Sequence, residues 1–188
     1  NLIIGSNTND ILTRFFETGT MKLDEVQPTI SPSMDIQISS NFERLLFEVY
    51  NKDGAAVKKI MREFRASGNF KIDQWENDKV LQLFLAARVN DFDTAKMIKT
   101  IFDESGELID PHTAVGIMAE RSKRAEYEVP MISLATAHPA KFPEAVKNAS
   151  GVTPTIPSKI KFLNHKKEYY KIVPNDLNIV KNLITNTI

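Results

Sequence analysis

The sequence contains no cysteine, and this absence removes three classes of site. Without a thiol, the 188-residue chain can form no disulfide, no thiolate metal centre and no cysteine nucleophile. An excess of charge of one sign is also lacking, because 24 Lys and Arg balance 24 Asp and Glu. A neutral chain has no overall field that would attract nucleic acid or an anionic membrane. We therefore expect neither as a partner, although charge balance has no bearing on one small phosphate ligand.

Long apolar runs are missing as well. The longest, Leu83–Ala87, is far too short to cross a bilayer, so we expect a cytoplasmic protein without a membrane partner. The three histidines lie far apart in the sequence and lack a paired carboxylate motif, so no metal site is predicted. The chain opens without Met, on a stretch that resembles the middle of a strand. We therefore expect a fragment of a longer protein.

Hydrophobic residues make up 42% of the chain and charged residues 26%, which is ordinary for a globular protein. A short apolar strand is predicted at Leu2–Gly5, followed by the polar turn Asn7–Asp10 and a helix that Gly19 would end. Further along, Asp110 and Pro111 favour the start of a helix. Gly116 inside that helix suggests close packing against another element, since glycine costs about 1 kcal/mol there. This order of elements predicts a mixed α/β chain.

The pattern between Asp53 and about Asp110 predicts three helices and indicates no chemistry. The first carries an apolar stripe at helical spacing and ends at Gly68. The second is predicted over residues 75–87, and the third ends at Gly106. The apolar positions are Val57, Ile60, Met61 and Phe64, then Trp75, Val80, Leu83, Phe84 and Ala87, then Ala95, Ile98, Ile101 and Phe102. We interpret residues 53–107 as a helical insertion or cap.

The most informative stretch is Ser133–Phe142. The apolar residues Val129, Met131, Ile132 and Leu134 predict a buried strand, which runs into hydroxyl, imidazole and ammonium groups before a helix begins at Pro139. Open α/β sheets bind ligands at such strand ends, and phosphate is favoured at helix N-termini. The alternative is a polar corner that only caps its helix. After a turn-rich segment, Tyr169–Val173 predicts an edge strand, and Asp176 a helix cap.

Four ordered blocks of the sequence resemble one family. They are Asn7-Thr8-Asn9-Asp10, Ser31-Pro32-Ser33-Met34-Asp35-Ile36-Gln37 running into Ser39-Ser40-Asn41-Phe42-Glu43-Arg44, Asp110-Pro111-His112-Thr113-Ala114-Val115-Gly116, and Ala135-Thr136-Ala137-His138-Pro139-Ala140-Lys141-Phe142. Together these blocks resemble the hallmark motifs of threonine synthases. A single block would be weak evidence, whereas four in order are specific. The resemblance is expected to fade after about residue 150.

The resemblance implies a fold and a reaction. The fold would be the tryptophan-synthase-β-like fold of fold-type II pyridoxal-phosphate enzymes, an open, mostly parallel sheet with flanking helices. The implied reaction converts O-phosphohomoserine and water to threonine and phosphate. In this family a hydroxyl group faces the pyridine nitrogen of the cofactor, and Thr136 matches that position. The cofactor supplies the electron sink, and the protein sets its protonation.

The resemblance also implies candidate substrate contacts. His138 and Lys141 lie beside Thr136 in the sequence, and Arg44 is the candidate able to hold a phosphate with a two-pronged guanidinium. Ser40 and Glu43 are assigned to helix capping, and Asp110 and His112 to bracing the wall of the site. The remaining candidates come from the two N-terminal blocks: Asn7, Asn9, Asp10, Ser31, Ser33, Asp35 and Asn41.

The family's Schiff-base lysine and its glycine-rich loop for the cofactor phosphate belong to a segment N-terminal to this sequence. No lysine here has the required context, so the chain is expected to form an incomplete site and to be inactive alone. Its missing partner would be the N-terminal part of the same enzyme. The competing hypothesis is a non-catalytic α/β interaction module, with an exposed apolar stripe on the helices of residues 53–106 and no convergence of the polar blocks.

Four parts are predicted along the chain. Residues 1–52 and 108–150 would belong to the α/β core, the latter with the cofactor-facing strand. Residues 53–107 would be the insertion, and residues 151–188 a C-terminal loop, edge strand and helix.

Overall fold

A computed structural model of the protein describes residues 1–73, 75 and 78–186. The fold is α/β, as the sequence predicts. The chain divides into two compact units, residues 1–155 and residues 156–188, and the finer four-part division stays a prediction. Among the described residues, no helix is both long and apolar enough to cross a membrane.

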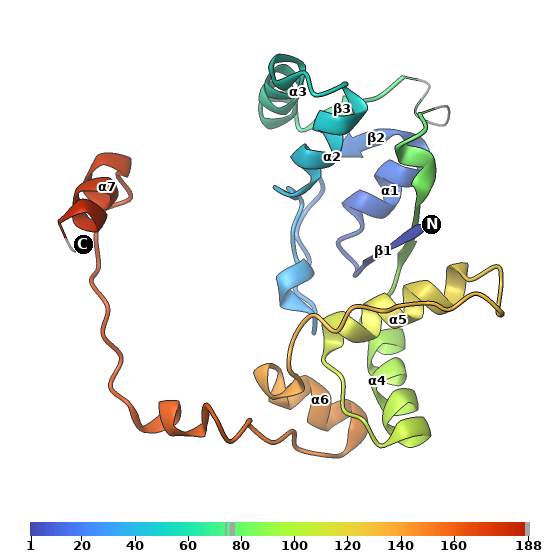
Figure 1. The fold of residues 1–188 in the computed structure, drawn as a ribbon, viewed down its shortest axis with the longest axis vertical. Coiled ribbons are helices and arrows are strands. Elements are labelled where there is room, and N and C mark those ends of the chain that lie inside the picture. The colour runs from blue at the N-terminus through green and yellow to red at the C-terminus, as the bar shows by residue number, and fades with distance from the viewer. Residues whose placement is uncertain (74, 76–77, 187–188) are drawn as a thin grey trace. The chain divides into compact units, whose positions relative to one another are not determined.

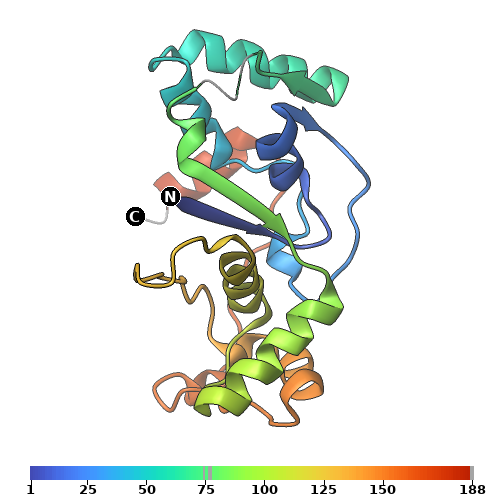
Figure 2. The same ribbon diagram turned by 90° about the vertical axis from the view of Figure 1, so that its right-hand side faces the viewer.

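The first unit is built on a parallel pair of strands, β1 (Leu2–Ser6) and β4 (Phe84–Arg88), which lie side by side in Figure 2. Successive side chains of a strand point to opposite faces. On one face Ile4 packs toward α1 (Ile11–Thr18). On the other, Ile3 packs against Val115 and Ala119 of α5 (Pro111–Lys123). The sheet is therefore covered on both faces, and β1 runs between α1 and α5 in Figure 1.

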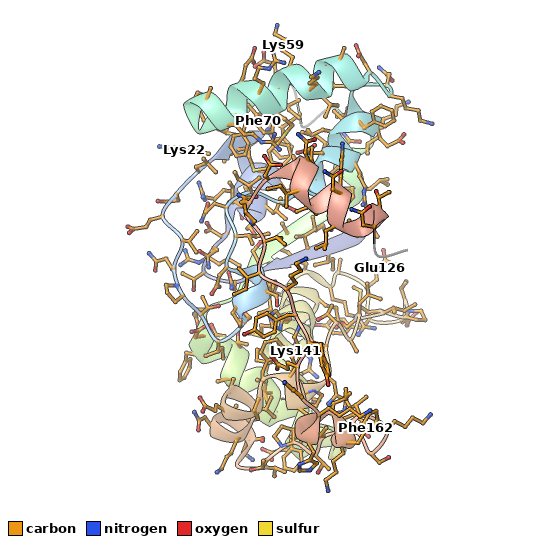
Figure 3. All side chains as sticks on the ribbon, turned by 90° about the vertical axis from the view of Figure 1, so that its left-hand side faces the viewer. Lys22, Lys59, Phe70, Glu126, Lys141 and Phe162 are labelled. Carbon is orange, nitrogen blue, oxygen red and sulfur yellow. The ribbon has the colours of Figure 1, made fainter. Side chains whose placement is uncertain are left out.

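The larger hydrophobic core lies on the α1 side of the sheet and is rich in aromatic rings. It is closed by α2 (Phe42–Val49), α3 (Gly54–Ser67) and the antiparallel pair β2 (Thr20–Lys22) and β3 (Asn69–Lys71). In Figure 3, Phe70 lies beneath α3, whereas Lys59 stands on its outer side. The fully buried large residues of this core are Ile11, Phe15, Leu46, Phe64 and Leu81.

Three helices form the other side of the unit. These are α4 (Asp91–Ser105), α5 and α6 (Pro143–Ser150), grouped together in Figure 1. Their shared contacts are made by Met97, Ile98, Ala114 and Val146. Because α5 contacts both this cluster and the sheet, its position fixes one wall of the space beside β1.

Several helix ends agree with the sequence analysis. Gly19, Gly68 and Gly106 end α1, α3 and α4 with left-handed φ values of 69°, 76° and 76°. Such values cost a glycine little because it has no Cβ. Asp110 caps α5 through the amides of His112 and Thr113. These predictions are confirmed because each depends on local backbone chemistry.

The helix predicted over residues 75–87 is wrong. Residues 76 and 77 lie outside the described part, and residues 81–87 form the 3-10 turn η3 (Leu81–Leu83) followed by β4 (Phe84–Arg88). A short apolar run fits a buried strand as well as a helix. Pairing with β1, about eighty residues earlier, decides in favour of the strand, with Leu2 opposite Phe84. The segment 53–107 is therefore not wholly helical, since it supplies β3 and β4 to the sheets.

The buried strand predicted around Val129–Leu134 is also wrong. The segment is extended but pairs with no strand of the described chain, and Val129, Ile132 and Leu134 are exposed by 53%, 82% and 76%. A strand needs neighbouring backbone groups for its ladder. Here the Arg124 guanidinium takes the place of a neighbouring strand at one backbone group, because it donates to the Val129 carbonyl at 3.0 Å.

The second unit contains η5 (Lys161–His165) and α7 (Leu177–Thr185). Asp176 caps α7 by accepting from the amides of Asn178 and Ile179, as predicted. The predicted edge strand at Tyr169–Val173 is wrong, since this unit offers it no neighbouring strand among the described residues. The side chains of Tyr169, Tyr170 and Ile172 in this segment are exposed instead.

Candidate functional site

A cavity of about 490 Å³ lies beside β1, and separate parts of the chain line it. They are β1 itself, η1 (Pro32–Met34), α5, the extended segment of residues 131–136 with Ala137 after it, and Lys141 in η4 (Pro139–Lys141). The polar side chains on its wall are Asn1, Ser33, His112, Glu120, Ser133, Thr136 and Lys141. Residues separated by about one hundred positions thus meet around one space.

Three of the predicted site residues line this cavity: Ser33, Thr136 and Lys141. Thr136 is exposed and ends the extended segment, and Lys141, labelled in Figure 3, lies in η4 five residues later. His138 is not among the lining residues described. Its Nδ1 accepts the Ala140 amide at 3.1 Å, so it caps η4 as the alternative interpretation expects. A substrate contact of His138 stays a prediction.

The start of α5 places a buried carboxylate behind the cavity wall. Asp110 is 0% exposed, and each of its carboxylate oxygens accepts two hydrogen bonds, both from the same residue. Oδ1 accepts from the His112 amide at 2.9 Å and from His112 Nδ1 at 2.8 Å. Oδ2 accepts from the Thr113 amide at 3.3 Å and from the Thr113 hydroxyl. A buried carboxylate needs such donors to remain charged without a large desolvation cost.

The side chains of His112 and Thr113 also accept hydrogen bonds from two backbone amides of the cavity wall. The Ser33 amide donates to His112 Nε2 at 3.1 Å, and the Thr136 amide donates to Thr113 Oγ1 at 3.1 Å. The His112 ring also packs on Phe142, with 4.5 Å between ring centroids. These contacts agree with the bracing role that the sequence analysis assigned to Asp110 and His112.

Four further candidates converge in a buried network behind η1. Asn7 Nδ2 donates to Asp35 Oδ1 at 2.7 Å and to Ser31 Oγ at 3.0 Å. Asn9 Nδ2 donates to the same Asp35 oxygen at 3.1 Å. The structure therefore brings the first two polar blocks together. Their side chains hold the loop that carries Ser33, and substrate contact by them stays a prediction.

Asp10, Asn41 and Arg44 lie elsewhere in the first unit. Asp10 is ion-paired with Arg14 at 2.8 Å and with Arg88 at 3.5 Å. Arg44 lines a separate groove of about 700 Å³ between α2 and α3, and Asn41 is the exposed residue that precedes α2. Roles of these residues toward the substrate stay predictions.

The predicted capping box at Ser40 and Glu43 is wrong. The helix begins two residues after Ser40, at Phe42, so the required spacing is lost. The Glu43 carboxylate instead accepts from Arg65 on α3 at 3.3 Å.

Comparison with known proteins places this geometry in a family. Residues 113–184 match the family model described as threonine synthase, C-terminal. The chain is 42% identical to threonine synthase from Pseudomonas aeruginosa, over 94% of this chain and 38% of that protein. It is 38% identical to threonine synthase from Saccharomyces cerevisiae, over 97% of this chain and 40% of that protein. A crystal structure of PLP-bound threonine synthase from Brucella melitensis matches with a TM-score of 0.82 and 45% identity, over 99% of this chain and 40% of that one.

The chain belongs to the threonine synthase family. It spans about two fifths of the length of the threonine synthases that it matches. The expected fading of the resemblance after residue 150 is wrong, because the family model extends to residue 184.

The sequence analysis assigned no site role to Thr113 or Gly116, nor to Glu120 and Ser133, which line the cavity. Thr113 stands three residues after Asp110, where an N-capping carboxylate meets its helix, and that spacing could have identified it. The packing expected at Gly116 is wrong. A Cβ built there meets nothing within 4 Å among the described residues, and Gly116 borders the cavity.

Alanine substitutions at two glycines of the cavity wall should have different effects on stability. A Cβ on Gly5 would lie 3.1 Å from Val115 Cγ1 and 3.1 Å from the Val115 carbonyl oxygen, so Gly5→Ala should destabilise the chain by about 1–3 kcal/mol. Gly116→Ala should be neutral or stabilise α5 by up to about 1 kcal/mol, because helix propensity improves and nothing is displaced. Urea denaturation of the two variants measures both effects. Equal shifts of the same sign would contradict the packing described between β1 and α5.

Proposed function

We propose that this chain forms the C-terminal part of a pyridoxal-phosphate-dependent threonine synthase, a lyase that converts O-phosphohomoserine and water to threonine and phosphate. The observation that carries the proposal is the cavity in which Ser33, Thr136 and Lys141 meet. The likeness to a PLP-bound threonine synthase over 99% of the chain supports it. The cytoplasmic location expected from the sequence stays part of this proposal.

The residues around the cavity fit one wall of a cofactor site. When bound, pyridoxal phosphate supplies an electron sink for carbanion chemistry at the substrate's Cα and Cβ. Thr136 would present a neutral hydroxyl to the pyridine nitrogen, as its place at the end of the lining segment allows. Lys141 would offer a cation to the phosphate or carboxylate of the substrate. Gly116 leaves room beside α5 that a larger side chain would fill.

The interaction-module hypothesis has less support. It requires an exposed apolar stripe on the helices of residues 53–106. Instead, Val57, Met61 and Phe64 of α3 are buried, as are Met97 and Ile98 of α4. The meeting of Ser33 and Thr136 at one cavity also argues against it.

A chimera tests the proposal directly. This chain would replace the matched region of the Pseudomonas aeruginosa threonine synthase, and phosphate release from O-phosphohomoserine would be measured. We expect turnover, because the chimera joins this cavity wall to the segments that the longer relative contributes. A folded chimera that binds the cofactor but releases no phosphate would contradict the proposal.

The 188-residue chain by itself should be inactive. Mixed with pyridoxal phosphate, it should show no absorbance of lysine-bound cofactor and no site-specific lysine modification after borohydride treatment. A stable adduct on one lysine would show that the chain holds its own cofactor-binding lysine and would refute this prediction.

A further inference from the structure

We propose that the buried carboxylate of Asp110 positions two separate parts of the cavity wall, Ser33 through His112 and Thr136 through Thr113. The inference rests on the proposed function for its catalytic consequence, but the contacts themselves belong to this chain. Asp110, His112 and Thr113 are on this account positioning residues.

Helix capping alone does not explain the arrangement. An N-cap aspartate needs only to accept amides of the first helical turn. Asp53 does this at α3, where its Oδ1 accepts from the amides of Ala55 and Ala56. Asp110 accepts two amides in the same way, and in addition accepts from the imidazole of His112 and the hydroxyl of Thr113.

The donors and acceptors fix the state of both side chains. A carboxylate can only accept, so His112 Nδ1 must carry a proton, and an amide can only donate, so Nε2 must be bare. The Asp110 carboxylate thus selects the neutral tautomer that can bind Ser33. In the same way it accepts the hydrogen bond of the Thr113 hydroxyl, which leaves an oxygen lone pair of Thr113 to accept from the Thr136 amide.

The two contacts join parts of the chain that no regular structure connects. Ser33 lies in η1, in a loop held from behind by Asn7. Thr136 ends an extended segment that pairs with no strand of the described chain. Without a ladder, the position of that segment depends on side-chain contacts such as the one from Thr113. One carboxylate at the start of α5 therefore sets the distance between the η1 wall and the Thr136 wall.

Amide hydrogen exchange of the 188-residue chain, followed by NMR, tests the His112–Ser33 contact and the Thr113–Thr136 contact separately. Thr113→Val removes the acceptor of the Thr136 amide and should speed its exchange by about fivefold or more, with the Ser33 amide unchanged. His112→Phe should have the reverse effect. Asp110→Ala should speed exchange at both amides, whereas Asp53→Ala, which removes a comparable cap from α3, should change neither.

Kinetics of the chimera test the consequence for catalysis. Thr113→Val should lower kcat about tenfold or more, because displacing a reacting wall by about 1 Å has effects of this size, with KM within about twofold. Thr113→Ser keeps the hydroxyl and should restore kcat. This rescue separates positioning from a general loss of packing.

Two results would overturn the inference. One is an unchanged exchange rate of the Thr136 amide in Thr113→Val. The other is an equal increase in the exchange rates of the Ser33 and Thr136 amides in both Thr113→Val and His112→Phe. An active chimera in which Thr113→Val keeps its full kcat would equally overturn the positioning role. If the unmutated chimera is inactive while the exchange results hold, the proposed function fails and the structural linkage stands.

Discussion

Replacing Thr136 by valine is expected to lower the kcat of the chimera about 100-fold, a typical loss when one oriented hydrogen-bonding group is removed from a reaction centre. Valine matches threonine in shape and removes only the hydroxyl. The backbone amide of residue 136 would still donate to Thr113, so the wall should keep its position. The measurement is the rate of phosphate release at saturating O-phosphohomoserine, together with the absorbance spectrum of the bound cofactor.

Two comparisons make this prediction specific. Thr136→Ser keeps the hydroxyl and should retain most of the activity. The unfolding midpoint of Thr136→Val should stay close to that of the unmutated chain, because Thr136 is exposed. Unchanged turnover in the valine variant would refute the assignment of Thr136 to the cofactor.

The largest loss of stability is expected for Phe15→Ala. Phe15 is 0% exposed and makes edge contacts with Phe16 and Phe42, with ring centroids 5.3 Å and 4.8 Å apart. Truncating a fully buried phenylalanine costs about 3–5 kcal/mol through lost burial and the cavity left behind. Since domains are stable by only about 5–15 kcal/mol, this change should leave a large unfolded fraction under mild urea.

Phe92→Ala provides the matched control. This phenylalanine lies in the first turn of α4 and is 77% exposed, so its truncation should change the free energy of unfolding by less than about 0.5 kcal/mol. Urea denaturation followed by circular dichroism measures both variants. Similar midpoints for the two would contradict the placement of Phe15 at the centre of the core.

Local chemistry made part of the fold predictable. Gly19, Gly68 and Gly106 mark helix ends, because their positive φ values are a property of single residues. The stripe of α3 was also correctly predicted, since its apolar residues repeat at helical spacing.

Strands were harder to predict, because a strand depends on its partner. The run before Arg88 pairs with β1, about eighty residues earlier, and no local pattern reveals that pairing. The segment Val129–Leu134 has a strand's composition, yet the described chain offers it no neighbour.

In the candidate site, too, local motifs were predictable and contacts between distant residues were not. Motif resemblance predicted Ser33, Thr136 and Lys141 as site residues, and all three line one cavity, while their roles toward a ligand stay predictions. The polar turn at Asn7 was recognised, but its pairing with Asp35 depends on a loop that folds back across the strand end. The double role of Thr113 was not predictable, because it appears only when α5 lies beside residue 136.

The commitment of both ring nitrogens of His112 limits what that imidazole can do during a reaction. Nδ1 donates a hydrogen bond to Asp110, and Nε2 accepts one from the amide of Ser33. Either ring nitrogen could contact a ligand only if its present partner moved away. A ligand that reached His112 from the cavity would therefore have to displace the η1 loop at Ser33.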